Sequence, residues 1–170
     1  MKFAVWVVAF LMNLVFQSTL FTFFQIKGVR PDLLIILVIF VALFRGPVEG
    51  GKAGFLAGLL EDLVVGQFIG MNAFIKMFVG IVVGLFEKRL YRENLLIPTA
   101  MVFIGTFIAG TLFILLFNSF GPDIKWIEGL YSLVMPTCLY NTIIGFLIYK
   151  PIYRLHKHFK GKRWSFRQIF

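Results

Sequence analysis

The sequence predicts an all-α polytopic membrane protein with about six transmembrane helices. Apolar residues make up 59% of the 170 residues, charged residues only 15%, and the mean hydropathy is +0.89. Long apolar runs recur along the chain, and no polar stretch between them is long enough for a separate catalytic domain. A soluble core of this length cannot bury so much apolar surface, whereas a bundle of membrane helices can.

The first span is expected at residues 3–25, in a run too long for a signal peptide and followed by no small-residue cleavage site. We therefore interpret it as an uncleaved helix. Asn13 and Gln17 are four residues apart, so they lie on one helical face. We expect them to form hydrogen bonds between helices.

The second span, expected at residues 31–44, is unusually short. Its uncharged part covers residues 33–44, or about 18 Å of helix, against about 30 Å for a hydrocarbon core. We expect Pro31, Asp32 and Arg45 to set the depth of this span, with Asp32 and Arg45 reaching to the two interfaces. A re-entrant pair formed with the next span is the alternative.

Small residues recur at a spacing of four in the third and fourth spans, expected at residues 47–65 and 71–86. This spacing places them on one face of each helix, where they allow close approach of another helix. Both packing within the chain and packing of a partner helix fit the pattern. The candidate helix-packing or partner-binding residues are Gly50, Gly54, Gly58 and Asp62 on the third span and Lys76, Gly80 and Gly84 on the fourth.

Asp62 and Lys76 lie at similar depths on these two antiparallel spans, so we hypothesise an ion pair across the glycine seam. In the alternative, both side chains extend to the nearby interface. Glu61 and Asp62 are not expected to act as a catalytic pair, because adjacent helical residues point about 100° apart.

The fifth and sixth spans are expected at residues 95–117 and 131–149. Pro47, Pro98 and Pro136 lie near predicted helix starts, where a missing N–H costs least, and Pro151 lies just beyond the last span. The predicted organisation is a single transmembrane domain at residues 1–150, followed by a basic, aromatic tail at 151–170.

Lysine and arginine counts predict the orientation. With both termini in the cytoplasm, 13 of these residues lie inside and 3 outside, which follows the positive-inside rule. The net charge of +9 is therefore mostly a cytoplasmic edge, and the tail suits anionic lipid headgroups.

No pattern in the chain indicates an enzyme, a metal site or a cofactor site. His156 and His158 have no carboxylate or thiol nearby, and Cys138 is alone within an apolar run. We expect no catalytic residue, cofactor, metal or nucleic acid. The segment around Trp126 is expected to lie at the outer interface or to contact an external partner.

An ordered set of residues between positions 30 and 84 resembles the bacterial rod shape-determining protein family MreD. The set is Pro31-Asp32-Leu33-Leu34, Phe40-Val41-Ala42-Leu43, Arg45-Gly46-Pro47, Gly54-Phe55, Gly58, Asp62-Leu63, Gly66 and Gly70. Chain length, the short second span and the basic end also fit, and Glu61 before Asp62 is the one unexpected residue.

The resemblance implies a non-enzymatic scaffold of the elongasome in the bacterial inner membrane. Its implied partner is the bitopic protein MreC, with indirect links to MreB filaments, RodA and a class B penicillin-binding protein that control cell shape and peptidoglycan synthesis. The family is also similar in fold to the S-components of energy-coupling-factor transporters. A small-molecule binder or transporter is therefore the alternative function.

Overall fold

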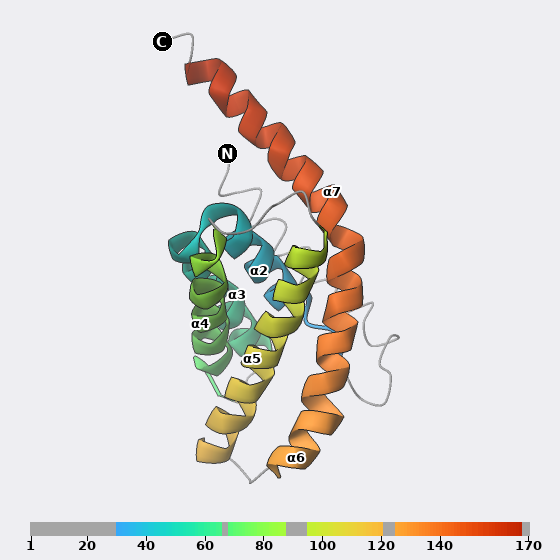
Figure 1. The fold of residues 1–170 in the computed structure, drawn as a ribbon. Coiled ribbons are helices and arrows are strands. Elements are labelled where there is room, and N and C mark those ends of the chain that lie inside the picture. Colours follow the sequence, from blue (N-terminus) through green and yellow to red (C-terminus); the bar gives the residue numbers. More distant parts are fainter. Residues whose placement is uncertain (1–29, 66–67, 88–94, 121–124, 168–170) are drawn as a thin grey trace.

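The computed structural model describes residues 30–65, 68–87, 95–120 and 125–167, with side chains described up to residue 156. The regular structure in these ranges is entirely helical (Figure 1). The predicted first span lies outside the described residues. The helices are α2 (Leu33–Arg45), α3 (Pro47–Val65), α4 (Met71–Leu85), α5 (Leu96–Phe120), α6 (Trp126–Gly129), the π-helix η2 (Leu130–Val134) and α7 (Met135–Arg167).

Local sequence signals explain where α2 and α3 begin and end. The side chain of Asp32 caps α2 by accepting a hydrogen bond of 2.9 Å from the backbone N–H of Ile35. Gly46 ends α2 with a φ of +88°, a conformation that favours glycine. Pro47 is the first residue of α3, where its missing N–H costs nothing. A single residue thus turns the chain from one helix into the next.

The last helix extends beyond the predicted span, residues 131–149, at both ends. The structure has one continuous helical path from Trp126 through η2 and α7 to Arg167, and Pro151 lies inside α7. Pro136 is also interior, ten residues after Trp126, and it has no N–H for the carbonyl four residues earlier. The π-helical turn immediately before Pro136 changes the bonding pattern, since the N–H of Met135 reaches the carbonyl of Leu130.

Two helical segments are long and apolar enough to cross a membrane: Leu96–Phe120 and Trp126–His156. Two shorter apolar helices, α2 and α4, accompany them. The predicted bounds of the third span match α3, and those of the second and fourth spans are within two residues of α2 and α4. The predicted number of six spans goes beyond what these helices establish.

The core is built around α2, which contacts α3, α4, α5 and α7. Ten of its 13 residues are buried, from Leu34 to Phe44 with only Leu37 partly exposed. Figure 1 shows α3 and α4 on one side of α5 and the α6–α7 helix on the other. The far end of α7 projects beyond the rest of the bundle. Before this projecting end, an aromatic cluster joins α2 to α7; its rings are Phe40, Phe44, Tyr149, Tyr153 and His156.

Candidate functional site

The glycine seam between α3 and α4 is the closest helix contact in the described structure. A Cβ at Gly54 would lie 2.1 Å from the backbone oxygen of Lys76, and one at Gly58 would lie 2.3 Å from that of Asn72. Gly50 and Gly80 meet in the same way, with Cβ-to-oxygen distances of 2.5 and 2.3 Å. Gly84 lies against Pro47 at the start of α3. The seam is therefore filled by α4 of the same chain.

Asp62 is buried at the end of this seam, where it caps the start of α4. Its Oδ2 accepts hydrogen bonds from the backbone N–H of Gly70 (2.9 Å) and Ala73 (3.1 Å). Its Oδ1 accepts from the backbone N–H (3.1 Å) and the side-chain amide (2.9 Å) of Asn72. A helix N-terminus presents N–H groups and positive dipole charge to an anion. The carboxylate is therefore satisfied without any ion pair.

We predict that Asp62→Asn destabilises the protein by about 2 kcal/mol, because hydrogen bonds to a charged acceptor contribute about 1.5–3 kcal/mol. An amide keeps one acceptor oxygen and turns an N–H₂ group toward the backbone donors. Thermal melting of the purified chain in detergent should show a loss of about 4–8 °C. Glu49→Gln is the control, since among the described residues this exposed carboxylate pairs only with Lys52. An unchanged melting temperature in Asp62→Asn would contradict the capping role.

Lys76 is 2% exposed and has two carboxylate partners, neither of which is Asp62. Its ammonium forms an ion pair and a hydrogen bond with Oδ2 of Asp32. It also forms an ion pair with Oε2 of Glu61, at 2.9 Å. The hypothesised Asp62–Lys76 pair is therefore wrong. A buried ammonium needs an acidic partner, and here Asp32 at the start of α2 and Glu61 on α3 provide it.

Asp32 extends this charged cluster into the other half of the bundle. Its backbone N–H donates to Oδ1 of the buried Asn141 on α7, at 2.9 Å. The side-chain amide of Asn141 donates to Oγ1 of the buried Thr106 on α5, at 3.2 Å. A continuous polar network thus connects α3, α4, α2, α7 and α5. Its members are Glu61, Lys76, Asp32, Asn141 and Thr106.

The network places the start of α2 well inside the bundle. We call the end that carries the α3–α4 turn the outer end, following the predicted orientation. Phe68 beside this turn packs edge-on against Phe117, with ring centroids 5.8 Å apart, so α5 ends on the same side. Asn141 is 15 residues after Trp126, or about 22 Å along the helix. Asp32 faces Lys76 at this depth, with 26% of its side chain exposed, and its expected place at a membrane interface stays a prediction.

Sequence reasoning found Asp32, Asp62 and Lys76 but paired them incorrectly, and it missed Asn141 and Thr106 as members of one network. The spacing argument did separate Glu61 from Asp62 correctly, since Glu61 faces Lys76 and Asp62 faces the start of α4. A sequence signal for the true pairing existed in the charge count. Between residues 53 and 86 Lys76 is the only base in the sequence, so Glu61 was as good a candidate partner for it as Asp62.

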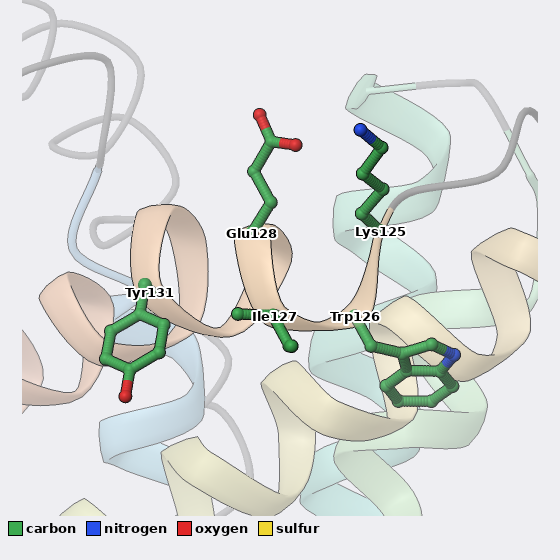
Figure 2. A pocket seen from close by; sticks show the side chains of 5 residues that line it. All are labelled: Lys125, Trp126, Ile127, Glu128 and Tyr131. Atoms are coloured by element: carbon green, nitrogen blue, oxygen red, sulfur yellow. The ribbon is translucent and has the colours of Figure 1, made fainter.

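A surface depression lies over α6, far from the polar network. It is lined by Lys125, Trp126, Ile127, Glu128 and Tyr131, and Figure 2 shows Lys125 and Glu128 pointing away from the side on which Trp126 lies. Trp126, Ile127 and Tyr131 are exposed. Amphipathic rings beside charged groups suit a membrane interface. Among the described residues, no three His, Cys, Asp or Glu side chains are placed to hold a metal ion.

The fold and the network define a helical membrane protein whose buried charges hold its own helices together. The family model of the rod shape-determining protein MreD matches residues 1–159 of the chain. The chain belongs to the MreD family, and its role is in the determination of rod shape. Comparison with curated proteins and with solved structures gave no match.

Proposed function

We propose that this protein is a non-enzymatic inner-membrane scaffold of the cell-elongation machinery. It binds the single membrane helix of an MreC-like partner and, through it, acts with MreB filaments, RodA and a class B penicillin-binding protein in peptidoglycan synthesis. Both termini lie in the cytoplasm, and the basic end of α7 faces anionic lipids there. The mechanism is association rather than turnover.

One observation carries this proposal: the glycines of the seam and the carboxylate of Asp62 contact helices of the same chain, so they are not available to a partner helix. The glycine seam is filled by α4, and the carboxylate of Asp62 is satisfied by the start of α4. The described helices turn large apolar side chains outward, including Phe78 on α4 and Leu56 on α3. Membrane helices associate by van der Waals packing, so an outward apolar face of the bundle suits the binding of another membrane helix. The partner therefore binds an outward face, not the seam.

Co-expression with the MreC-like protein of the same genome tests this proposal. A tag on the present chain, followed by detergent purification and size-exclusion chromatography, should recover the partner in a fixed ratio. Four exposed residues then probe four helices, one alanine substitution each: Leu56, Phe78, Phe107 and Leu147. We expect one of them to weaken co-purification about tenfold, as loss of an interface anchor does. If the wild-type chain elutes from the size-exclusion column without the MreC-like protein, the scaffold proposal fails.

The small-molecule alternative is favoured by one feature of the structure. Asp32 and Glu61 keep 26% and 17% of their side chains exposed, although they belong to a buried charged cluster. A ligand of the folded state would raise the melting temperature in proportion to the logarithm of its concentration. A screen of metabolites and cell-wall precursors in which no compound shifts the melting temperature would remove this alternative.

A further inference from the structure

The polar network lies at the middle of the two segments that are long and apolar enough to cross a membrane. Asn141 is the central residue of Trp126–His156, with 15 residues on each side of it. Thr106 lies two residues from the centre of Leu96–Phe120. The backbone N–H of Asp32 donates to Asn141, and Figure 1 shows the start of α2 (blue) beside α7, well away from α6. The short helix α2 therefore begins close to mid-membrane.

The α3–α4 pair ends not far beyond this level. Glu61 lies four residues before the end of α3, or about 6 Å, and Lys76 lies five residues after the start of α4, or about 8 Å. From Asn141 to Trp126, by contrast, the helical path continues outward for about 22 Å. The turn between α3 and α4 therefore lies deeper than the outer ends of α5 and α6. A membrane-spanning element that is too short thins the bilayer around it.

Two carboxylates stay partly exposed at this depth. Asp32 and Glu61 keep 26% and 17% of their side chains exposed, whereas Lys76 between them is buried. Residues 30–32 are not helical, and Arg30 is exposed. Hydrocarbon tolerates neither exposed charges nor non-helical backbone; both occur at membrane depth where protein covers them or water reaches them. The uncovered parts of the two acids therefore require water.

The described residues close the inner side of this level and leave the outer side open. Ten apolar residues of α2 between Leu34 and Phe44 are buried, and the aromatic cluster packs around the inner end of the helix. In the α3–α4 turn, a Cβ at Gly70 would meet no atom within 4 Å. The space beside this turn is therefore open, next to the backbone N–H that donates to Asp62. Water that reaches the two acids thus comes from the outer side.

We propose that the outer aqueous phase reaches the charged cluster of Asp32, Lys76 and Glu61 at mid-membrane, through a water-filled inlet over the α3–α4 turn. Asp32 then meets the aqueous phase because water enters the bundle, not because its side chain extends out of it. Small hydrophilic cations of the outer phase have the same access to the two carboxylates. The side of entry rests on the orientation given with the proposed function, whereas the binding of a partner plays no part in it.

Cysteine accessibility measures the inlet directly in the full-length chain. Glu61→Cys is introduced in a Cys138→Ala background, so that no native thiol remains. This change leaves Asp32 and Lys76 as a balanced pair, so the variant is expected to fold. The probe, added to spheroplasts, is a methanethiosulfonate with a trimethylammonium group, which reacts in water and does not cross membranes. After denaturation, maleimide–polyethylene glycol counts the unreacted thiols on a gel.

Two further variants in the same background make the result interpretable. Leu139→Cys is the matched control, because Leu139 lies two residues from Asn141 and is 59% exposed on the outside of α7. It therefore reports the same depth on a surface that faces lipid. Tyr131→Cys reports the sidedness, since Tyr131 is exposed beside α6 at the outer end.

We expect the probe to block Glu61→Cys several-fold faster than Leu139→Cys, and to block Tyr131→Cys as well. Equal rates for Glu61→Cys and Leu139→Cys overturn the proposal, since protein or lipid then covers the cluster. Reaction of Glu61→Cys in inverted vesicles alone also overturns it, because water would then enter from the cytoplasm. Neither result depends on whether an MreC-like partner binds, so this test and the co-purification test can fail independently.

If the Glu61→Cys chain does not fold, Arg30→Cys answers the same question. Arg30 is exposed on the non-helical segment, two residues before Asp32 and at most about 7 Å from it. The probe should block Arg30→Cys several-fold faster than Leu139→Cys. Equal rates for these two variants would show that water does not reach the start of α2.

Discussion

Replacing Lys76 with methionine should cause the largest loss of stability of any single charge change in the described bundle. Methionine nearly matches the length of lysine but leaves Asp32 and Glu61 without their shared ammonium. Removing one partner from a buried ion pair typically costs about 3–5 kcal/mol, because the remaining charge stays buried and uncompensated. We expect the variant to accumulate poorly and to elute as aggregate on size-exclusion chromatography. Any soluble fraction should melt well below the wild-type chain.

The matched control is Lys52→Met. Lys52 is 67% exposed and pairs with Glu49 at 3.2 Å, so its loss should change stability by less than about 1 kcal/mol. Neutralising Asp32→Asn and Glu61→Gln together with Lys76→Met should recover part of the lost stability. Reversing the charges of Asp62 and Lys76 together should not, since the two do not pair. A Lys76→Met chain that behaves like Lys52→Met would contradict the network.

Gly54→Ala should be nearly as damaging, for a purely steric reason. The added methyl carbon would lie 2.1 Å from the backbone oxygen of Lys76 and 2.5 Å from its carbonyl carbon. Backbone atoms of a helix cannot move aside as a side chain can, so α3 and α4 must separate. Overpacking of this kind costs about 1–3 kcal/mol and sometimes more. The melting temperature should fall by about 2–12 °C, if the chain accumulates at all.

Gly51→Ala provides the comparison within the same helix. The nearest atoms to its Cβ would all belong to side chains, with Cγ1 of the exposed Ile81 at 2.8 Å and Cγ of Met77 at 3.9 Å, and no backbone atom is among them. We therefore expect a much smaller decrease than for Gly54→Ala. Equal melting temperatures for the two variants would mean that α3 and α4 do not pack at this distance.

The helices α2, α3 and α4 could be predicted well because their ends carry strong local signals. Asp32, Pro47 and Gly70 mark starts or turns by side-chain capping, a fixed φ and a positive φ, respectively. The last helix was predicted poorly because Pro136 and Pro151 were taken as boundaries. A π-helical turn accommodates the first, and helix bonding continues around the second.

The polar site was only half predictable, because depth and distance between helices are properties of the packed bundle. A spacing of four places Gly50, Gly54 and Gly58 on one face, but it cannot say which helix fills that face. Similar depth suggested that Asp62 faces Lys76. Equal depth does not show on which side of its helix a side chain lies. In the structure Asp62 faces the start of α4, and Lys76 faces Asp32. Asn141 enters the network from a distance of 109 residues in sequence.

The central claim is that inward residues build the bundle while an outward face binds the partner. Its most direct test measures, for one set of variants, both the melting temperature of the chain alone and the amount of MreC-like protein that co-purifies per chain. We predict that Gly54→Ala and Lys76→Met lower the melting temperature, whereas one outward alanine variant loses the partner at an unchanged melting temperature. The account is contradicted if Gly54→Ala or Lys76→Met keeps the wild-type melting temperature but loses the partner. It is also contradicted if every outward alanine variant still co-purifies the partner.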